Sequence, residues 1–179
     1  YQLGIQTDSI YSKARIKNIK IEQLQATVES GTIPVVAGFQ GVDEMDRITT
    51  LGRGGSDTTA VALAAALKSS CCEIYTDVDG VYSADPRVVP EARKIPRLSY
   101  DEMMEMAALG SKVLHFRCVE IAAKFQVPIQ VLAPFSENTG TWIQKEVTEM
   151  EAPVVSAVTH DSKVVVLQAE PIPEGVDFL

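Results

Sequence analysis

The sequence predicts an α/β domain with a largely parallel β-sheet. Short apolar runs typical of buried strands alternate with segments of helical periodicity, and loops rich in glycine and aspartate follow these runs. Apolar residues make up 46% and charged residues 22% of the 179, which is ordinary for a folded protein and excludes a disordered chain. Ligands bind beyond the carboxyl ends of parallel strands, so the loops are the first candidates for a site.

Four segments carry helical signals. In chain order they are Ile21–Val28, Ser56–Lys68, the run after Ser99, and Lys112–Phe125. Gly31 is expected to end the first helix, and Ser56 is a good N-cap for the second. Ser99 with Glu102 three residues later forms a capping box, and the three methionines that follow are expected to fill the core.

Three apolar runs are expected to be strands: Ile33–Ala37, Cys71–Tyr75 and Ile129–Leu132. The glycine-rich loop Gly38–Gly41 follows the first strand, and the polar loop Thr76–Gly80 follows the second. Loops that follow strands of one sheet converge on the same crevice.

The chain divides into three parts. Residues 1–145 form the main domain, residues 146–153 are a polar and acidic linker, and residues 154–179 begin a second domain with a strand over Val154–Leu167. Nothing at the start of the sequence has the form of a secretory signal, and no apolar run is long enough to cross a membrane.

Charge and cysteine usage limit the partners. Sixteen basic and 24 acidic residues give a net charge of −8, which argues against nucleic acid and against an anionic membrane surface. The three cysteines have no metal-ligand spacing and are expected to be free, buried thiols in a reducing cytoplasm. No resident metal site is predicted.

The stretch Thr49–Asp57 is the most informative. Its three glycines allow a tight turn and a close approach to a ligand, and the helix that follows presents backbone amides to an anion. Arg53 within the loop can form a bidentate pair with a carboxylate or phosphate. The alternative is a plain glycine-rich turn in which Asp57 only complements the helix dipole. The spacing matches neither a P-loop nor a dinucleotide fingerprint.

Two further sites follow along the chain. The segment Thr76–Arg87 has groups suited to a nucleotide: Tyr82 to flank a base, Arg87 to reach phosphates, and acidic residues for ribose or Mg²⁺. Its Asp-Gly and Asp-Pro pairs are also ordinary turn formers. Lys112 at a helix start is unfavourable unless it faces an anion, and His115 is expected to be a packed or hydrogen-bonded residue.

Together these blocks resemble the aspartate kinases of the amino-acid kinase superfamily. The matching blocks are Thr7-Asp8, Ala14–Ile16, Val36–Gly41, Thr49–Asp57, Tyr75–Arg87 and Gly110–His115. The resemblance runs from Tyr1 to about Ile143. It implies a three-layer α/β sandwich with a mostly parallel central sheet, followed by the start of a ferredoxin-like ACT domain through which homo- or hetero-oligomers form.

The resemblance also implies an activity and its cofactors. The γ-phosphoryl group of ATP, with Mg²⁺, would pass to the side-chain carboxylate of L-aspartate, giving 4-phospho-L-aspartate at the start of lysine, threonine and methionine synthesis. A carboxylate is already ionised, so no general base is required. A loose transition state needs positioning and positive charge.

Roles are carried over by motif. Asp57 and Lys112 are the expected catalytic residues. Those expected to bind aspartate are Arg53, Ser56, Phe39, Gly38 and Gly41. Those expected to bind the nucleotide are Tyr75, Thr76, Asp77, Val81, Tyr82, Asp85, Pro86, Arg87 and Lys112.

Departures from the family pattern leave alternatives. The family's Lys-Phe-Gly-Gly segment has no match here, and His115–Cys118 replaces a common His-Pro-Arg-Ser. We therefore expect residues 1–179 alone to lack measurable aspartate kinase activity. The alternatives are a kinase acting on acetylglutamate or glutamate, and a nucleotide-binding module without catalysis.

Overall fold

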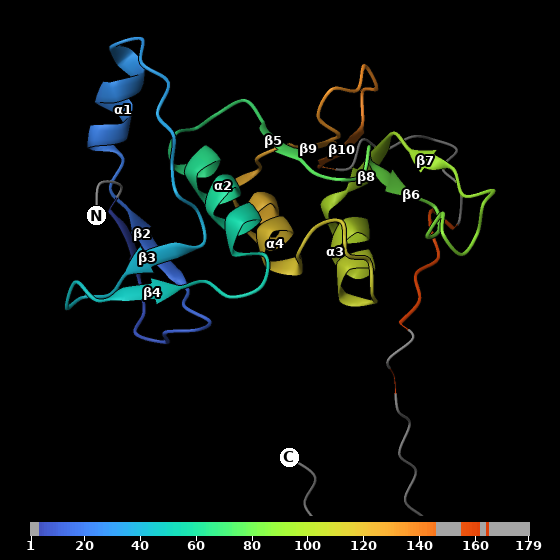
Figure 1. Ribbon diagram of the computed structural model, residues 1–179, viewed down its shortest axis with the longest axis horizontal. Helices are drawn as coiled ribbons and strands as arrows, with labels where there is room; N and C mark the ends of the chain where they lie inside the picture. The colour runs from blue at the N-terminus through green and yellow to red at the C-terminus, as the bar shows by residue number, and fades with distance from the viewer. Residues whose placement is uncertain (1–3, 146–154, 162–163, 165–179) are drawn as a thin grey trace, which may run out of the picture.

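The computed structural model describes residues 4–145, 155–161 and 164, which form two four-stranded sheets, one hairpin and four helices (Figure 1). The helices are α1 (Glu22–Glu29), α2 (Gly55–Ala66), α3 (Tyr100–Ala108) and α4 (Phe116–Phe125). The strands are β1 (Ile5–Thr7), β2 (Ile16–Ile19), β3 (Gln40–Val42), β4 (Ile48–Thr50), β5 (Cys72–Tyr75), β6 (Val81–Tyr82), β7 (Lys94–Ile95), β8 (Arg97–Ser99), β9 (Ile129–Leu132) and β10 (Thr141–Gln144). None of the helices in these ranges is long and apolar enough to cross a membrane.

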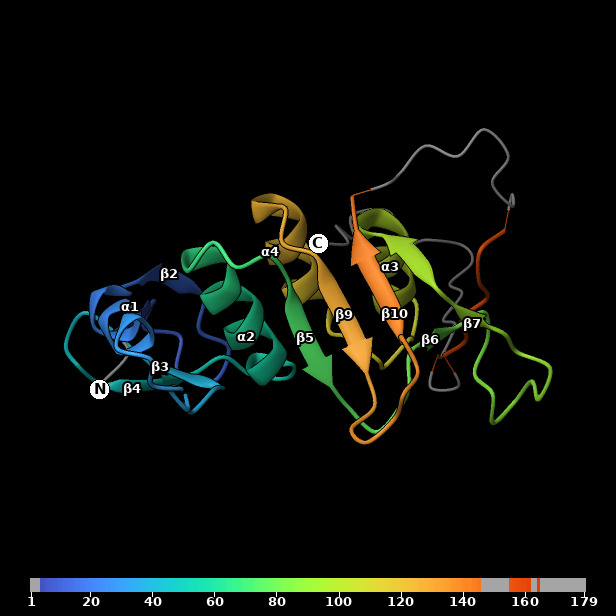
Figure 2. The same ribbon diagram turned by 90° about the horizontal axis from the view of Figure 1, so that it is seen from above.

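The sheet of order β5-β9-β10-β8 carries three of the helices, and this sheet with its helices is here called the helical unit. Helices α2, α4 and α3 lie side by side on one face of the sheet (Figure 2). Strand β5 pairs with β9 in parallel and β10 pairs with β8 in parallel, whereas β9 and β10 are antiparallel. The α/β class is confirmed, with mixed pairing in the sheet. Residues 133–140 join β9 to β10, and this connection is too short for the crossover that a parallel pair needs.

The first sheet has the order β2-β1-β3-β4 and lies beside α2 (Figures 1 and 2). Strand β1 pairs with β3 in parallel, and the two outer pairs are antiparallel. The hairpin β6–β7 lies at the far end of the molecule, beyond β8. The helices α2, α4 and α3 therefore lie between the first sheet and the hairpin.

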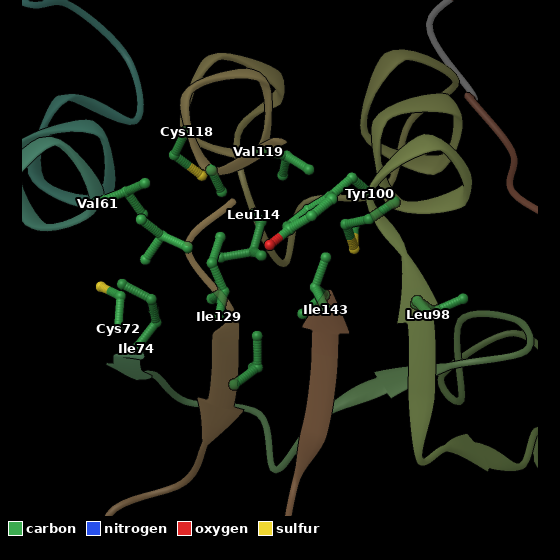
Figure 3. Close-up of a cluster of buried hydrophobic side chains, with 14 of the residues drawn as sticks. Val61, Cys72, Ile74, Leu98, Tyr100, Leu114, Cys118, Val119, Ile129 and Ile143 are labelled. Atoms are coloured by element: carbon green, nitrogen blue, oxygen red, sulfur yellow. The ribbon is translucent and has the colours of Figure 1, made fainter. Parts of the chain in front are cut away.

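The main core lies between the helices and the second sheet (Figure 3). Along β5 the side chains of Cys72 and Ile74 are buried, and those of Glu73 and Tyr75 are exposed, as strand alternation requires. Met103 of α3 is fully buried, which confirms that the methionines fill the core. The predicted strands at β5 and β9, the helix at α2 and the Ser99–Glu102 capping box are all confirmed.

The strand predicted over Ile33–Ala37 is wrong. The segment has no strand structure, and Ile33 and Val35 are 88% and 97% exposed. Pro34 has no N–H to give to a sheet, and no described strand pairs with this segment. Strand β3 begins later, at Gln40, so the glycine-rich segment Gly38–Gly41 leads into a strand and does not leave one.

Two predicted helix starts need correction. The N-cap of α2 is Gly54 in a left-handed conformation, and Ser56 lies within the first turn. Helix α4 begins at Phe116 with His115 as its N-cap, so Lys112 lies in the preceding loop and not against a helix dipole. A β-extended His115 whose ring accepts the N–H of Arg117 ends the loop there.

The predicted second domain lies mostly outside the described residues. The linker 146–153 and most of 154–179 fall there, so this division stays a prediction. The strand expected over Val154–Leu167 is not formed in its described part, because residues 155–161 carry no strand.

Arg117 joins three distant segments. Its guanidinium donates to the carbonyl of Leu51 at 2.6 Å and to the carbonyl of Ala14 at 2.9 Å. Leu51 precedes the glycine loop, and Ala14 lies between β1 and β2; both residues are fully buried. A single side chain on α4 therefore holds the first sheet to the helical unit.

We expect Arg117→Ala to lower the free energy of unfolding by about 2 kcal/mol, because two carbonyls lose charged donors. Urea denaturation measures this effect. Arg117→Lys should recover part of the loss, since an ammonium can serve only one of the two carbonyls well. The exposed Arg97→Ala is the matched control. Equal stability of the Arg117 and Arg97 alanine variants would contradict the bracing role.

Candidate active site

Two glycine loops meet at the start of α2, as the sequence predicted. The N–H of Phe39 donates to Oγ1 of Thr59 at 3.1 Å, and the carbonyl of Phe39 accepts the N–H of Leu51 at 2.9 Å. A Cβ on Gly55 would come within 2.8 Å of the Phe39 ring, and one on Gly38 within 3.4 Å of the Ser56 backbone. The space at Gly38 would admit a Cβ, but glycine is needed at Gly55, where the Phe39 ring covers the first turn of α2.

Gly41 belongs to a different contact. It lies in β3, where an added Cβ would be 2.6 Å from the methyl group of Thr7 on β1. Its small size lets the two parallel strands approach. Among the residues expected to bind aspartate, Gly41 is thus the one that packs into the first sheet.

Helix α4 begins beside the same loop. Gly54 has φ +69°, and a Cβ there would overlap the side chain of His115. The predicted packed role of His115 is confirmed by this contact. Figure 2 shows that α2 and α4 both begin at the edge of the sheet where β5 and β9 end. Backbone N–H groups of two helices therefore face the same edge, which favours anions there.

Arg53 and Lys112 are two of the cations of this region. Both are exposed, Arg53 on the glycine loop and Lys112 in the α3–α4 loop. Within the described ranges neither has an ion pair, whereas Lys17, Arg47, Arg87 and Lys94 each have a carboxylate partner. These two side chains are available to bind an anionic ligand.

Asp57 is half-buried in the first turn of α2. Burial raises the pKa of its carboxyl group, while a hydrogen bond from Ser56 at 3.4 Å and the nearby His115 oppose this. A partly desolvated carboxylate beside an anion-binding loop requires a cation close by when a ligand is bound.

The polar loop after β5 is held by one carboxylate. Asp79 accepts the Tyr82 hydroxyl at 2.8 Å, the Lys94 ammonium at 3.1 Å and the Asn138 amide at 3.1 Å. The hydrogen bond from Tyr82 lowers the pKa of Asp79, burial opposes this, and Lys94 lowers it further. Three segments are thereby fixed around Asp79.

The other predicted nucleotide residues lie along the same loop. Arg87 forms a bidentate pair with Asp85 at 2.8 and 3.0 Å, and this pair lowers the pKa of Asp85 to about 2. Pro86 forms the turn between them. The side chain of Val81 is buried in the core, and its N–H donates to Thr141.

At the end of β5 the hydroxyl groups bond to carboxylates. Tyr75 donates to Glu73 at 3.0 Å, and Thr76 donates to Asp77 at 3.1 Å. The carboxylate of Asp77 is exposed, so it can also meet a ligand.

The cysteines take no part in this chemistry. Cys72 and Cys118 are free and buried, and burial raises their pKa values to about 11 and about 12. Both thiols stay protonated at neutral pH and are poor nucleophiles.

Surface hollows occur elsewhere in the described structure. Two, of about 290 and 310 Å³, lie along α3, the first lined by Ser99 and Lys145 at the ends of β8 and β10. Strand β10 runs antiparallel to β9, so these residues lie at the opposite edge of the sheet. The candidate active site lies at the other edge, where the two glycine loops and the loop before α4 meet.

Comparison with protein families matches residues 1–133 to the amino acid kinase family. The chain belongs to this family. The fold type predicted from the sequence is thereby confirmed, since solved aspartate kinases superpose on the described structure.

The proteins that this chain resembles most clearly include several aspartate kinases. One from Pseudomonas putida is 53% identical over 99% of this chain and 44% of its own length. E. coli aspartokinase III, crystallised with aspartate and ADP, matches 82% of this chain and 34% of that chain with a TM-score of 0.72 and 34% identity. Aspartate kinase from Synechocystis matches 86% and 25% with a TM-score of 0.68 and 44% identity. The chain thus spans less than half the length of these relatives.

Sequence reasoning missed the residues that fix the loops. Lys94 and Asn138 hold Asp79, and Arg117 holds the glycine loop through Leu51. Lys94 and Asn138 lie in none of the matching blocks. Arg117 lies in His115–Cys118, for which no such contact was predicted from the sequence.

Asp79→Asn should reveal the lowered pKa as a pH dependence of stability. The folded carboxyl binds a proton less readily than the unfolded one, so its stabilisation is complete above its ordinary value of 3.8 and is lost as pH falls below that. We expect the variant to be less stable than wild type at pH 7 and the difference to shrink below about pH 4. Urea denaturation between pH 3 and 7 measures this. A difference that stays constant over the range would contradict it.

Proposed function

We propose that the complete protein transfers the γ-phosphoryl group of ATP to the side-chain carboxylate of L-aspartate, giving 4-phospho-L-aspartate and ADP. The observation that carries the proposal is Arg53, an exposed guanidinium without an ion pair in the described ranges, on a glycine loop at a helix N-terminus. The similarity to aspartokinase III, solved with aspartate and ADP, supports it.

Aspartate would bind at the glycine loop. The fork of the Arg53 guanidinium suits the α-carboxylate of the substrate bidentately. Gly38, Phe39 and Ser56 would flank it, since their segments meet at this loop. Gly41 would contribute to aspartate binding only indirectly, by letting β3 pack closely against β1 in the first sheet.

ATP would bind along the loop after β5. Thr76, Asp77, Tyr82 and Arg87 offer hydroxyl, carboxylate, ring and guanidinium groups there. In the reaction one oxygen of the aspartate side chain attacks the γ-phosphorus, and the bond from phosphorus to the β-bridging oxygen breaks as ADP leaves. Lys112 would stabilise the charge on the transferred group, and Asp57 would orient the cations.

Mg²⁺ would arrive with the nucleotide. No cluster of three or more acidic, histidine or cysteine side chains occurs in the part of the chain that the structure describes. This fits a Mg²⁺ that binds mainly through phosphates, with one or two carboxylates such as that of Asp77. When bound, it neutralises charge on the phosphate oxygens.

An assay across candidate acids tests the proposed reaction. The complete protein should release ADP with L-aspartate, and hydroxylamine should trap an acyl phosphate. N-acetyl-L-glutamate and L-glutamate, the substrates of the alternative kinases, should give background rates. Binding of an ATP analogue without turnover on any acid would favour the non-catalytic alternative.

We also propose that the complete protein forms oligomers through ACT domains. The residues of these domains lie beyond the described ranges.

Arg53→Ala should raise the KM for L-aspartate by at least about 50-fold and that for ATP by less than about threefold, since a charge-assisted pair with substrate is lost. Steady-state kinetics on the complete protein measures both constants. Arg53→Lys should recover only part of the loss. Equal effects on the two substrates would contradict the assignment, and Arg97→Ala is the control.

Lys112→Ala should lower kcat by at least about 100-fold, because positive charge at the phosphoryl group stabilises the transition state. Lys124→Ala, which removes an exposed lysine from α4, should leave kcat unchanged. Near-normal turnover of the Lys112 variant would show that this lysine is only solvated.

A further inference from the structure

Residues 155–161, here called the docked segment, contact parts of the kinase domain that are distant from them in sequence. Ala157 packs against the main hydrophobic core. The hydroxyl of Ser156 donates to the carboxylate of Glu102, the same side chain that completes the capping box of α3. Beyond the described end of β10 the chain therefore returns to α3 and attaches to its first turn.

The docked segment next contacts the loop proposed for the nucleotide. The N–H of Val158 donates to the carbonyl of Ser83 at 2.8 Å. Ser83 follows β6 directly; its N–H donates to the carbonyl of Arg93, the residue before β7, and its hydroxyl accepts the N–H of Arg93. The contact through Val158 thus reaches the stretch between Tyr82 and Asp85.

The far end of the docked segment meets the loop that carries Lys112. A Cβ on Gly110 would lie 2.6 Å from the carbonyl oxygen of His160, so the two backbones are in direct contact. Gly110 has φ +120°, a conformation that other residues rarely adopt. His160 also lies close enough to Asp85 to help lower the pKa of that carboxyl group.

We propose that the docked segment is a positioning element of the nucleotide site, a role that rests on the proposed function. It is in contact with two loops that come from different parts of the chain, the Ser83–Arg87 stretch and the Gly110–Lys112 loop. Both are proposed to hold the nucleotide, the first along its length and the second at the phosphates. By bonding to the first loop and to α3 and by packing against the second loop, the segment sets the distance between the two loops.

This role is specific to one substrate. The hydrogen bonds of Ser156 and Val158 and the backbone contact of His160 all lie away from the glycine loop at Gly52–Ser56 and from Phe39, where aspartate is proposed to bind. Loosening the docked segment should therefore weaken ATP binding and leave aspartate binding intact. A merely stabilising contact would not separate the two substrates.

Val158→Pro in the complete protein tests the proposal, because proline removes the N–H that donates to Ser83. The KM for ATP should rise about fivefold, as expected for one lost backbone hydrogen bond, and the KM for L-aspartate should change by less than about twofold. Calorimetry with a non-hydrolysable ATP analogue should show the same loss of affinity. Val155→Pro, at a residue with no hydrogen bond to the described chain, is the control and should leave both constants unchanged.

Ser156→Ala is the milder second variant and decides the outcome if the proline variant does not fold. It should raise the KM for ATP about twofold to threefold, with thermal unfolding close to that of wild type. Variants that bind the ATP analogue as tightly as wild type would overturn the positioning role. A wild-type protein that binds the analogue but shows no aspartate-dependent turnover would instead overturn the proposed function, and the calorimetric comparison would still test the docked segment.

Discussion

The double hydrogen bond from Arg117 to the backbone is the constraint on which the site depends most. Leu51 is fully buried, and its carbonyl accepts a charged hydrogen bond from Arg117, so removing that donor costs stability. The same carbonyl lies one residue before the glycine loop, so the bond fixes where that loop starts. Because the other half of the guanidinium holds Ala14, the first sheet cannot shift without moving the loop.

Electrostatics then separates the cations that have a carboxylate partner from those that have none. The chain has a net charge of −8, and four of its cations are paired with carboxylates in the described structure. Arg53, just before α2, and Lys112, in the loop before α4, have no such ion pair within the described ranges. Two helix N-termini and two available cations at one edge of the sheet favour a ligand with several negative charges, as aspartate and a nucleotide triphosphate together provide.

Local sequence patterns predicted the elements that depend on residues close together in the chain. The run Ile129–Leu132 is β9 as expected, and Ser99 with Glu102 caps α3. The Ile33–Ala37 prediction failed because an apolar run is a strand only where a partner strand accepts its hydrogen bonds. The Asp79 network and the Arg117 brace escaped sequence reasoning for a related reason: each joins segments far apart in the chain, and spacing carries no signal for such contacts.

A crystal structure of the complete protein with L-aspartate and a non-hydrolysable ATP analogue tests the central claim most directly. The account predicts the α-carboxylate of aspartate on the guanidinium of Arg53, the Phe39 segment beside it, and the γ-phosphate within reach of Lys112. Aspartate bound away from the glycine loop, with Arg53 directed to solvent, would contradict it.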